Sequence, residues 1–572
     1  MDPRLAALAQ PFRADYLDWD GVDRQLAAWT QAFPDLCRVE LLGRTEGGRE
    51  IPVLVIGRDP DRYRPAVWID ANMHASELAG SSVALGIAED VLALHLDPEL
   101  TLHGLSRAAC DVVRDGLFYV LPRMSPDGAE QILKSGRWVR SVPRDPRHHQ
   151  LHPHWLHEDV DGDGLALAMR VPDPGGEYVA LEGHPSALRP RLVEDEGPFY
   201  RLYPEGRVAG FDGDSVPDPW FLSDNATDLN RNFPVEWRSE PDQAGAGLYA
   251  MSEVEAHAVV AYTAERPHLF AWLNLHTYGG VFIRPLGDKP DTAMDAEELA
   301  YYTQLAQWGE AFTGYPTVSG FEEFTYTPDK PLYGDIIAWA HRARGCFSFV
   351  VELWDLFEQL GLPRPKRFVD RYERLGREEL QKLAAFDTEH NAGRLFPAWR
   401  EVEHPQLGKV EVGGFDPRIG LWNPPPDRLA GIVSGMSAVM LRVAAMAPRV
   451  VVTTEVVSHD GAAEVVVKVA NHGYLPTYVL PSAKALPMNE PLWLEVVATS
   501  LAVELAGSPR VKLGHLEGWG RGRFNPAQSI LFPRSRGTRN EAVARLHTRG
   551  HGGVTIRVGS CRVGFQTFTV EV

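Results

Sequence analysis

The pattern of apolar and polar positions over about the first 390 residues predicts an α/β architecture. Apolar side chains recur at helical spacing in three segments, which are residues 16–34, 81–96 and 367–390. Apolar strand-like runs that end in polar or glycine-bearing turns lie between them, at residues 37–57, 66–80, 116–128, 270–280 and 347–355. Strands that alternate with helices are typical of α/β domains, in which reactive residues collect where the strands end.

Three further segments depart from this alternation and define the predicted domain organisation. Residues 143–224 are dense in Pro, Gly, Asp and His with few periodic apolar runs, which predicts a long insertion. Residues 396–448 are mixed in character and predict a connector. From 449 to 572, β-branched runs alternate with turns such as Asp460-Gly461, which predicts a separate β-sandwich of Ig-like size. The first domain is therefore expected to span residues 1–395.

Composition and charge narrow the classes of partner. The chain has 572 residues, of which 44% are hydrophobic, so it can bury a large core and is too long for one ordinary domain. A formal net charge of −20 argues against nucleic acid or an anionic membrane as a partner. Four scattered cysteines with no Cys-x-x-Cys pair indicate neither a thiolate metal site nor a disulfide framework. No apolar run reaches the roughly 18 residues of a membrane span. No signal sequence is visible, so a cytoplasmic protein is expected, and a mature secreted form stays open.

Two histidines and a glutamate stand where predicted strands end. The apolar run at residues 67–69 gives way to a polar turn that carries His74 and Glu77, three positions apart. His276 ends the apolar run Leu-Asn-Leu-His and is followed by Thr-Tyr-Gly-Gly. Strand ends of this kind meet at one edge of an α/β sheet. Two histidines, one glutamate and a water molecule make up a hydrolytic zinc site, so the three residues are candidate zinc ligands.

Two other features strengthen the hydrolytic interpretation. Glu352 is flanked by apolar residues in the run Val-Val-Glu-Leu-Trp, where an unpaired carboxylate costs several kcal/mol to desolvate. A structural ion pair with a core arginine is the alternative explanation for it. Residues 227–234 place a compact Asp-x-Asn-Arg group in a polar loop.

At this point the chain resembles the zinc metallocarboxypeptidases, the relatives of carboxypeptidases A and B. The motifs of that family occur here in family order: HASE, SPDG, DLNRN, LHTYGG and VVEL, preceded by GRTEGGREI. The resemblance covers residues 16–390. It implies a mixed-sheet, phosphorylase/hydrolase-like domain, to which the C-terminal β-sandwich is added.

The resemblance also assigns roles to individual residues. It makes His74, Glu77 and His276 the ligands of Zn²⁺ and Glu352 the general base. Asn230 and Arg231 correspond to the pair that binds the C-terminal carboxylate of the substrate. Tyr278 corresponds to a residue that lines the substrate cleft. Asp228 corresponds to an acid that orients the first histidine ligand.

Two positions in the family pattern have two candidates each. The oxyanion-stabilising arginine next to a tryptophan corresponds to Arg137 or Arg140, and Arg140 is preferred. The mobile tyrosine that caps the bound C-terminus corresponds to Tyr326 or Tyr333, and Tyr326 is preferred. No acid in this stretch stands out as a determinant of side-chain specificity.

Two groups within the insertion suggest other metal sites. Asp159, Asp161 and Asp163 precede Gly164 as in the first half of a calcium-binding EF-hand loop, but Arg170 replaces the acid at the twelfth position. A solvated Asp-Gly turn is therefore the preferred interpretation. Five histidines between residues 148 and 157 are irregularly spaced and are interpreted as exposed loop residues.

These observations predict a zinc-dependent metallocarboxypeptidase that hydrolyses C-terminal peptide bonds of peptides with a free carboxylate. A first alternative keeps the fold but changes the substrate to a cell-wall peptide, a γ-glutamyl side chain or an N-acyl amino acid. A second alternative is an inactive binding module whose β-domain docks a partner. The presence of all three ligands and Glu352 argues against the second alternative.

Overall fold

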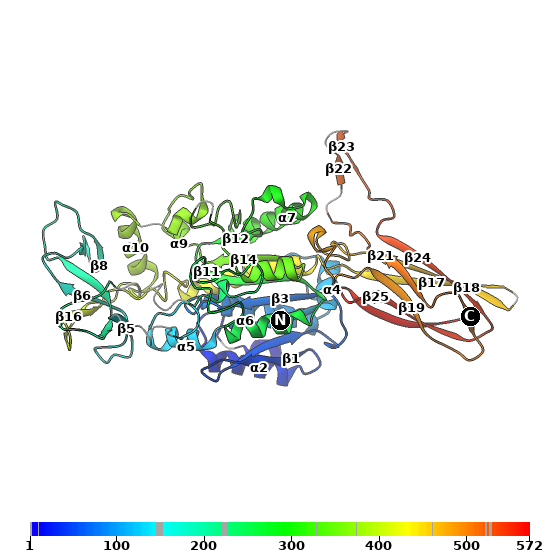
Figure 1. Ribbon diagram of the computed structural model, residues 1–572, viewed down its shortest axis with the longest axis horizontal. Helices are drawn as coiled ribbons and strands as arrows, with labels where there is room; N and C mark the ends of the chain where they lie inside the picture. The colour runs from blue at the N-terminus through cyan, green and yellow to red at the C-terminus, as the bar shows by residue number, and fades with distance from the viewer. Residues whose placement is uncertain are drawn as a thin grey trace.

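A computed structural model describes residues 3–9, 11–144, 153–218, 227–327, 330–372, 375–459, 461–520, 523–525 and 529–572. Figure 1 shows three bodies along the long axis of the molecule. A central α/β unit lies between a small β-rich lobe at one end and a C-terminal β-domain at the other. The prediction of an α/β domain followed by a β-domain is confirmed.

The central sheet has eight strands in the order β1-β2-β4-β3-β11-β14-β12-β13. Their bounds are β1 Cys37–Arg44, β2 Glu50–Ile56, β3 Ala66–Ala71, β4 Leu117–Leu121, β11 Leu269–Thr277, β12 Val281–Arg284, β13 Thr317–Ser319 and β14 Phe347–Leu353. The four inner strands β4, β3, β11 and β14 are parallel. Strands β1 and β2 pair antiparallel with their neighbours, whereas β12 pairs antiparallel with β14 and parallel with β13. Every residue of β3, β4 and β11 is buried, as expected for parallel strands covered on both faces.

Helices pack on both faces of this sheet. The helices of this unit are α2 Trp19–Ala32, α3 Ala79–Leu96, α4 Arg107–Asp115, α5 Pro126–Ser135, α6 Val254–Ala264, α7 Ala296–Thr313 and α11 Pro426–Ala444. Helix α10, Arg377–His390, instead contacts strands of the small lobe. Among the described helices, α3 is the one long and apolar enough to span a membrane, but 94% of it is buried, as in a core helix. It lies between β3 and β11 on one side and α11 on the other. Gly86 permits the close contact with α11, because a Cβ there would lie 2.2 Å from Val433.

The insertion forms most of the small lobe at the left of Figure 1. It contributes β5 His154–His157, β6 Ala168–Pro172, β7 Tyr178–Leu181, β8 His184–Pro190, β9 Tyr200–Pro204 and β10 Gly206–Ala209. A six-stranded sheet in the order β15-β16-β6-β9-β7-β8 is completed by β15 (Arg400–His404) and β16 (Gly408–Gly413). The segment expected to be a connector therefore supplies two strands to this lobe and, as α11, a helix to the central core.

Several features expected in the insertion fall outside the described residues. Residues 145–152 and 219–226 lie outside the described residues. They include three of the five insertion histidines that the sequence singled out: His148, His149 and His152. His157 is placed, and it is not an exposed loop residue. It lies in β5, accepts a hydrogen bond from the Trp138 backbone N–H at 2.9 Å and contacts the Leu167 carbonyl oxygen at 3.1 Å.

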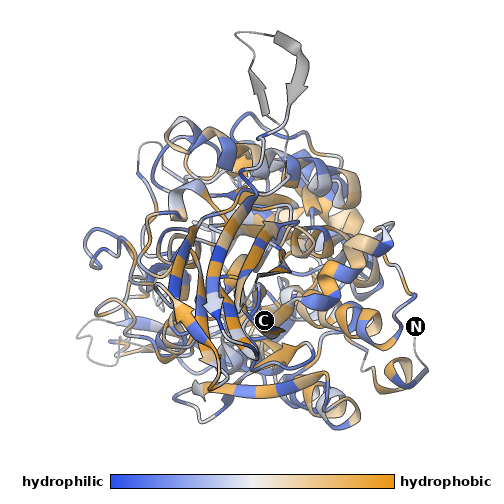
Figure 2. Ribbon diagram, turned by 90° about the vertical axis from the view of Figure 1, so that its right-hand side faces the viewer, coloured by the Kyte–Doolittle hydropathy of each residue, from blue (hydrophilic) through white to orange (hydrophobic). Residues whose placement is uncertain are grey.

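The C-terminal domain consists of two four-stranded antiparallel sheets, β17-β18-β24-β20 and β21-β19-β25-β26. Their bounds are β17 Val450–His459, β18 Ala462–Asn471, β19 Leu492–Thr499, β20 Glu504–Ala506, β21 Arg510–Gly514, β24 Glu541–Arg549, β25 Gly553–Ser560 and β26 Gly564–Glu571; a separate ribbon pairs β22 Arg523–Asn525 with β23 Ser529–Arg534. Apolar and polar residues alternate along the strands that face the viewer in Figure 2, and the apolar set forms the core between the sheets.

A buried arginine joins the β-domain to the central unit. Arg562, 1% exposed, donates hydrogen bonds to the carbonyl oxygens of Pro267 at 3.0 Å and Arg344 at 2.9 Å, and to that of Gly345. These carbonyls lie just before β11 and β14, the strands whose opposite ends carry His276 and Glu352. The β-domain is thus packed at the end of the sheet away from the candidate site.

Candidate active site

The predicted ligands and base meet at the carboxyl ends of the central parallel strands. Strand β11 pairs in register with both neighbours, so that Leu275 lies opposite Ala71 of β3 and His276 opposite Glu352 of β14. Residues opposite each other in a sheet project from the same face. The register therefore brings His276 beside Glu352 and places both next to the loop that follows β3, which carries His74 and Glu77.

Two asparagines hold the loop between β3 and α3. Asn72 adopts a positive φ of 54°, and its side-chain amide donates to the carbonyl oxygen of His74 at 2.7 Å. Asn423 donates to the carbonyl oxygen of Ser76 at 2.7 Å and accepts from the backbone N–H of Ala79 at 2.9 Å. The loop is thus fixed at both ends by side chains that the ligand pattern did not reveal.

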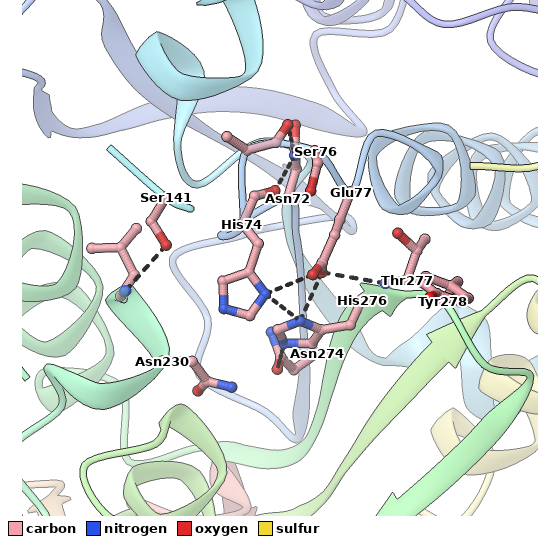
Figure 3. Close-up of polar contacts among 12 residues, drawn as sticks. Asn72, His74, Ser76, Glu77, Ser141, Asn230, Asn274, His276, Thr277 and Tyr278 are labelled. Atoms are coloured by element: carbon pink, nitrogen blue, oxygen red, sulfur yellow. Dashed lines mark hydrogen bonds and ion pairs between the residues drawn. The ribbon is translucent and has the colours of Figure 1, made fainter. Parts of the chain in front are cut away.

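The three candidate ligands converge through their inward atoms (Figure 3). His74 Nδ1 lies 2.7 Å from one Glu77 carboxylate oxygen, and His276 Nδ1 lies 2.8 Å from the other. The two Nδ1 atoms are 3.0 Å apart. The side chains of all three residues are at most 3% exposed. This group could hold a metal ion.

The outward nitrogens of the histidines decide what the inward atoms can do. His74 Nε2 lies 3.0 Å from a carboxylate oxygen of Asp228, and His276 Nε2 lies 2.6 Å from the side-chain oxygen of Asn274. Both partners are acceptors, so each ring holds a proton on Nε2, and deprotonation of Nδ1 gives a neutral imidazole whose Nδ1 lone pair can bind a cation. Two nitrogen lone pairs and a carboxylate facing one another are mutually repulsive without a cation. The donor set therefore fits zinc.

A buried carboxylate stands behind Asn274. The side-chain N–H₂ of Asn274 donates to one oxygen of Asp70 at 2.5 Å. The indole N–H groups of Trp68 and Trp272 donate to the other oxygen of Asp70, each at 2.7 Å. Burial raises the pKa of Asp70 to about 6, although these three donors oppose the rise. The donated bond to Asp70 fixes the orientation of the Asn274 amide, and hence the acceptor that His276 meets.

Glu352 is the remaining carboxylate at the strand ends and is partly exposed to the cleft. Burial raises its pKa to about 8, against the opposing charge of His276. By contrast, the charges of His74 and His276 outweigh burial at Glu77 and hold its pKa below the ordinary range. The two carboxylates thus differ in proton affinity, as expected for one that binds a cation and one that exchanges a proton.

A cavity of about 100 Å³ opens beside Glu352. Polar side chains on its wall include those of Arg140, Asn230, Arg231 and Tyr326, together with His74 and His276. Arg140 Nε contacts Asp228 at 3.2 Å, and an Arg140 Nη lies 3.5 Å from Glu77. Asn230 accepts from the backbone N–H of Ile336 at 3.0 Å. Positive guanidinium groups and a carboxylate therefore line one small space next to the ligand group.

The chain matches two protein-family models. The family model described as zinc carboxypeptidase matches residues 22–162 and 218–374. The chain belongs to the zinc carboxypeptidase family. A second family model, a domain of unknown function, matches residues 449–571.

Individual relatives are distant. Mouse carboxypeptidase A4 is 21% identical over 60% of this chain and 62% of its own length, and rat carboxypeptidase B2 is 20% identical over 59% and 63%. A solved carboxypeptidase A from Helicoverpa armigera is 18% identical, with a TM-score of 0.38 over 68% of this chain and 76% of that chain. The chain thus spans less than two thirds of the length of these two curated relatives.

The structure separates the paired candidates that this family's pattern left open. Arg140 lines the cavity, whereas Arg137 is exposed and its carbonyl oxygen lies against Gln131. Tyr326 lines the cavity with 55% of its side chain exposed, whereas Tyr333 packs against Arg238. The preferred residue of each pair is the one at the cavity.

Tyr278 lies beside the cavity rather than among its lining residues. Its ring contacts those of Phe357, Tyr372 and Trp422 at centroid distances of 5.8, 5.4 and 5.3 Å. The residue is partly exposed and follows His276 by two positions, so this aromatic cluster forms the neighbouring wall of the cleft.

Other cavity residues were not singled out by the sequence. Ile283, Phe324, Ile337 and Val350 supply apolar surface, and Asp335 is an acid within the wall. Asp335 also accepts from the backbone N–H of Ala338 at 2.7 Å and so caps the short helix α8 (Ile336–Ala338). The sequence does indicate a cap here, because Asp335 precedes an apolar segment and aspartate is a common N-cap residue. That pattern does not indicate that the residue lines a cavity.

A second group of acids lies in the small lobe. Oxygen atoms of Asp159, Asp161 and Glu205 come within 4.8 Å of one another, and Glu205 replaces the expected third acid Asp163 in this group. Arg400 forms ion pairs with both Asp161 and Asp163. A cationic side chain is therefore already paired with two of the three aspartates in the loop that was weighed as a calcium site.

Proposed function

We propose that this protein is a zinc-dependent carboxypeptidase that removes the C-terminal residue of peptides bearing a free carboxylate. One observation carries the proposal: Glu352 and Arg231 line the same cavity, and two of the three candidate zinc ligands, His74 and His276, also line it. An endopeptidase has no need of a guanidinium facing the space beyond the scissile bond. A planar guanidinium binds a terminal carboxylate through two parallel hydrogen bonds.

The residues of the site divide the chemistry among them. His74, Glu77 and His276 would hold the zinc ion through two imidazole nitrogens and a carboxylate. A bound zinc ion supplies Lewis acidity, which activates water near neutral pH and polarises a carbonyl group.

Proton transfer falls to Glu352, which lies beside His276 across the strand pair. Its carboxylate takes a proton from the attacking water and passes it to the nitrogen of the leaving amine. Arg140 directs guanidinium N–H groups toward the oxygen on which negative charge develops in the transition state. Asp228 contacts both Arg140 and His74 and so keeps the two groups in fixed relation.

Substrate recognition uses the opposite side of the cavity. Arg231 binds the terminal carboxylate, and its Nη donates to the Asn230 carbonyl oxygen at 2.7 Å, which orients the guanidinium. The exposed ring of Tyr326 is positioned to cover the bound terminus. Ile283, Ile337 and Val350 give the cavity an apolar wall, and its small volume suits a C-terminal side chain of modest size.

The proposal is tested with Glu352→Gln, which keeps the size of the side chain and removes its basicity. The zinc-loaded variant should bind one zinc ion as the wild type does and lose about 10²–10⁴-fold in kcat. Its matched control is Glu358→Gln, an exposed carboxylate shortly after the same strand. A wild type that is zinc-loaded yet no more active than Glu352→Gln on any substrate would support the inactive binding module.

A second test separates terminal from internal cleavage. The wild type should cleave peptides with a free C-terminus and spare their C-terminally amidated forms. Arg231→Ala should raise KM for the free peptides by about 10–100-fold, the effect of losing a charged hydrogen bond of about 1.5–3 kcal/mol. Equal cleavage of free and amidated peptides would refute the carboxypeptidase assignment. Cleavage confined to γ-glutamyl, cell-wall or N-acyl amino acid substrates would favour an amidohydrolase of the same fold.

A further inference from the structure

A second cavity, of about 260 Å³, lies where the small lobe meets the central unit. Strands β6 and β9 and the segment before β6 supply one side, and the segments after α5 and after β16 supply the other. Six of its lining residues carry the argument: Trp138, Leu167, Leu202, Tyr203, Phe415 and Pro417. All six are apolar or aromatic, so the cavity suits an uncharged, apolar group.

The ionisable side chain in the wall does not change this character. His157 accepts from the Trp138 backbone N–H through Nδ1, so its proton lies on Nε2 and points to the Leu167 carbonyl oxygen. Burial lowers the pKa of His157 to about 4, and the imidazole is therefore neutral near pH 7. Both ring nitrogens are used within the wall, and the ring adds no charge to the cavity.

Aromatic rings connect the cavity to the catalytic cleft. Trp138, in the cavity wall, packs on Trp422 with a centroid distance of 5.0 Å, and Trp422 packs on Tyr278 at 5.3 Å. Tyr278 follows the ligand His276 by two residues, and Trp138 precedes Arg140 by two. Extended peptide advances about 3.3–3.6 Å per residue, so at most about three residues span the two ring contacts.

The wall also contains an unsatisfied donor. The indole N–H of Trp138 has no hydrogen-bond partner among the described residues, and Trp138 is 9% exposed. Buried donors of this kind call for an acceptor that the protein itself does not supply, and a main-chain carbonyl oxygen of a bound peptide, unlike its apolar side chain, is such an acceptor.

We propose that this cavity binds the apolar side chain of a substrate residue about three positions to the amino side of the scissile bond. The inference rests on the proposed carboxypeptidase function and adds a substrate class to it, namely peptides with an apolar residue upstream of the cleaved bond. The cavity lies between the small lobe and the central unit, so selectivity at this position is built by the insertion, by the segment after α5 and by the segment around Phe415, not by the strands of the central sheet.

The test uses the full-length, zinc-loaded protein and a set of N-acylated hexapeptides with one fixed C-terminal residue. A single leucine replaces glycine in turn at each of the positions upstream of the scissile bond. The measured quantity is kcat/KM relative to that of an N-acylated dipeptide with the same C-terminus. Leucine at one position, the third or its neighbour, should raise this ratio about tenfold through KM, because binding removes the apolar surface of that side chain from water.

Variants locate the effect. Phe415→Ala, in an exposed part of the wall, and Leu202→Asp, in β9, should each reduce the tenfold preference to near unity. Val193→Asp is the matched control, because Val193 is a fully exposed apolar residue of the same insertion and lies outside the cavity wall. It should retain the preference, and thermal melting establishes that each variant is folded.

Each outcome bears on one proposal or on both. A wild type that cleaves the dipeptide and all hexapeptides with equal kcat/KM overturns the cavity assignment and leaves the carboxypeptidase assignment standing. A leucine preference that survives in both Phe415→Ala and Leu202→Asp also overturns it, because the side chain then binds elsewhere. A zinc-loaded wild type that cleaves none of the peptides, the dipeptide included, refutes the carboxypeptidase assignment and this inference with it.

Discussion

Two groups of potential metal ligands, one in the central unit and one in the small lobe, are alike in the spacing of their ligand atoms and differ in chemistry and orientation. His74, Glu77 and His276 form the first, and Asp159, Asp161 and Glu205 form the second. In each, three ligand atoms lie within 4.8 Å of one another. The first group is buried throughout, whereas the second runs from exposed Asp159 to buried Glu205.

The partners of the ligand atoms explain the difference. In the acidic group, the backbone N–H groups of Val160 and Leu167 each donate to one oxygen of Glu205, at 2.8 and 2.9 Å. Both oxygens of Asp159 likewise accept hydrogen bonds from backbone N–H groups, and Arg400 forms an ion pair with Asp161. In the histidine group, the partners of both imidazoles lie on the outer Nε2 atoms and the inner Nδ1 atoms face one another, although Glu77 also accepts from the Thr277 backbone N–H at 3.2 Å. Proximity of acids alone therefore does not make a metal site, and the direction of the lone pairs does.

The largest expected effect comes from variants that remove one ligand from each group. His276→Ala should reduce bound zinc from about one per chain toward none after dialysis, because two ligands remain where a catalytic site uses three. Peptidase activity should fall by more than about 100-fold, beyond the effect of losing a residue that only orients a ligand. The measurement is zinc content by elemental analysis together with kcat/KM. Asp161→Ala is the control and should retain full zinc content; equal zinc loss in the two variants would refute the distinction.

The sequence predicted the residues of the first group because each stands at the end of an apolar run. The end of an apolar strand locates the following residues at the edge of the sheet. The sequence could therefore place His74, Glu77, His276 and Glu352 at one edge of the sheet. Their supports could not be predicted in the same way. Asn423 is 347 residues from the Ser76 carbonyl that it binds, and no local pattern reports such a contact.

The fold shows the same division between local and distant information. Buried parallel strands such as β3 and β11 are continuous apolar runs and were visible in the sequence. The sheet of the small lobe was not, because its strands are short and only partly buried, and β15 and β16 join it from beyond α10. Strand partners separated by some 240 residues, such as Arg170 and Glu411, leave no periodic signal in either segment.

The next effect in size concerns the outer partner of His74. Asp228→Ala removes the acceptor that fixes the Nε2–H tautomer and should weaken zinc binding by about 10–100-fold, measured by competition with a chelator. Asp228→Asn retains an oxygen acceptor and should lose less. Asp163→Ala, which removes a carboxylate from the acidic loop, should leave zinc affinity unchanged. An Asp228→Ala variant with wild-type zinc affinity would show that the outer partner does not orient the ligand.

A smaller effect follows from the pKa of Glu205. Burial, with the neighbouring Asp161 and Asp159, raises this pKa from 4.5 to about 7. The folded state therefore binds the proton more tightly than the unfolded chain, so its stabilising contribution is complete below about pH 4.5 and is lost as the pH rises through about 7. After allowance for solvent screening, the loss is about 1–2 kcal/mol.

The measurement is the urea midpoint of wild type and Glu205→Gln between pH 4.5 and pH 8. The variant lacks this titration, and its midpoint should decline less than that of the wild type over the interval. A constant offset between the two is expected from the changed hydrogen bond to Leu167 and does not enter the comparison. Parallel curves would show that Glu205 is ionised throughout, as it would be beside a bound cation.

The smallest expected effect is that of Arg400, which is half exposed and pairs with Asp161 and Asp163. Arg400→Ala should lower stability by less than about 1 kcal/mol, since exposed ion pairs contribute little. Millimolar calcium should not raise the melting temperature of this variant, because backbone N–H groups still occupy the oxygens of Asp159 and Glu205. Lys409→Ala, which removes an exposed ion pair with Glu401, is the matched control. A calcium-dependent rise in Arg400→Ala alone would mean that one guanidinium, and not the orientation of the acids, keeps cations out of the second group.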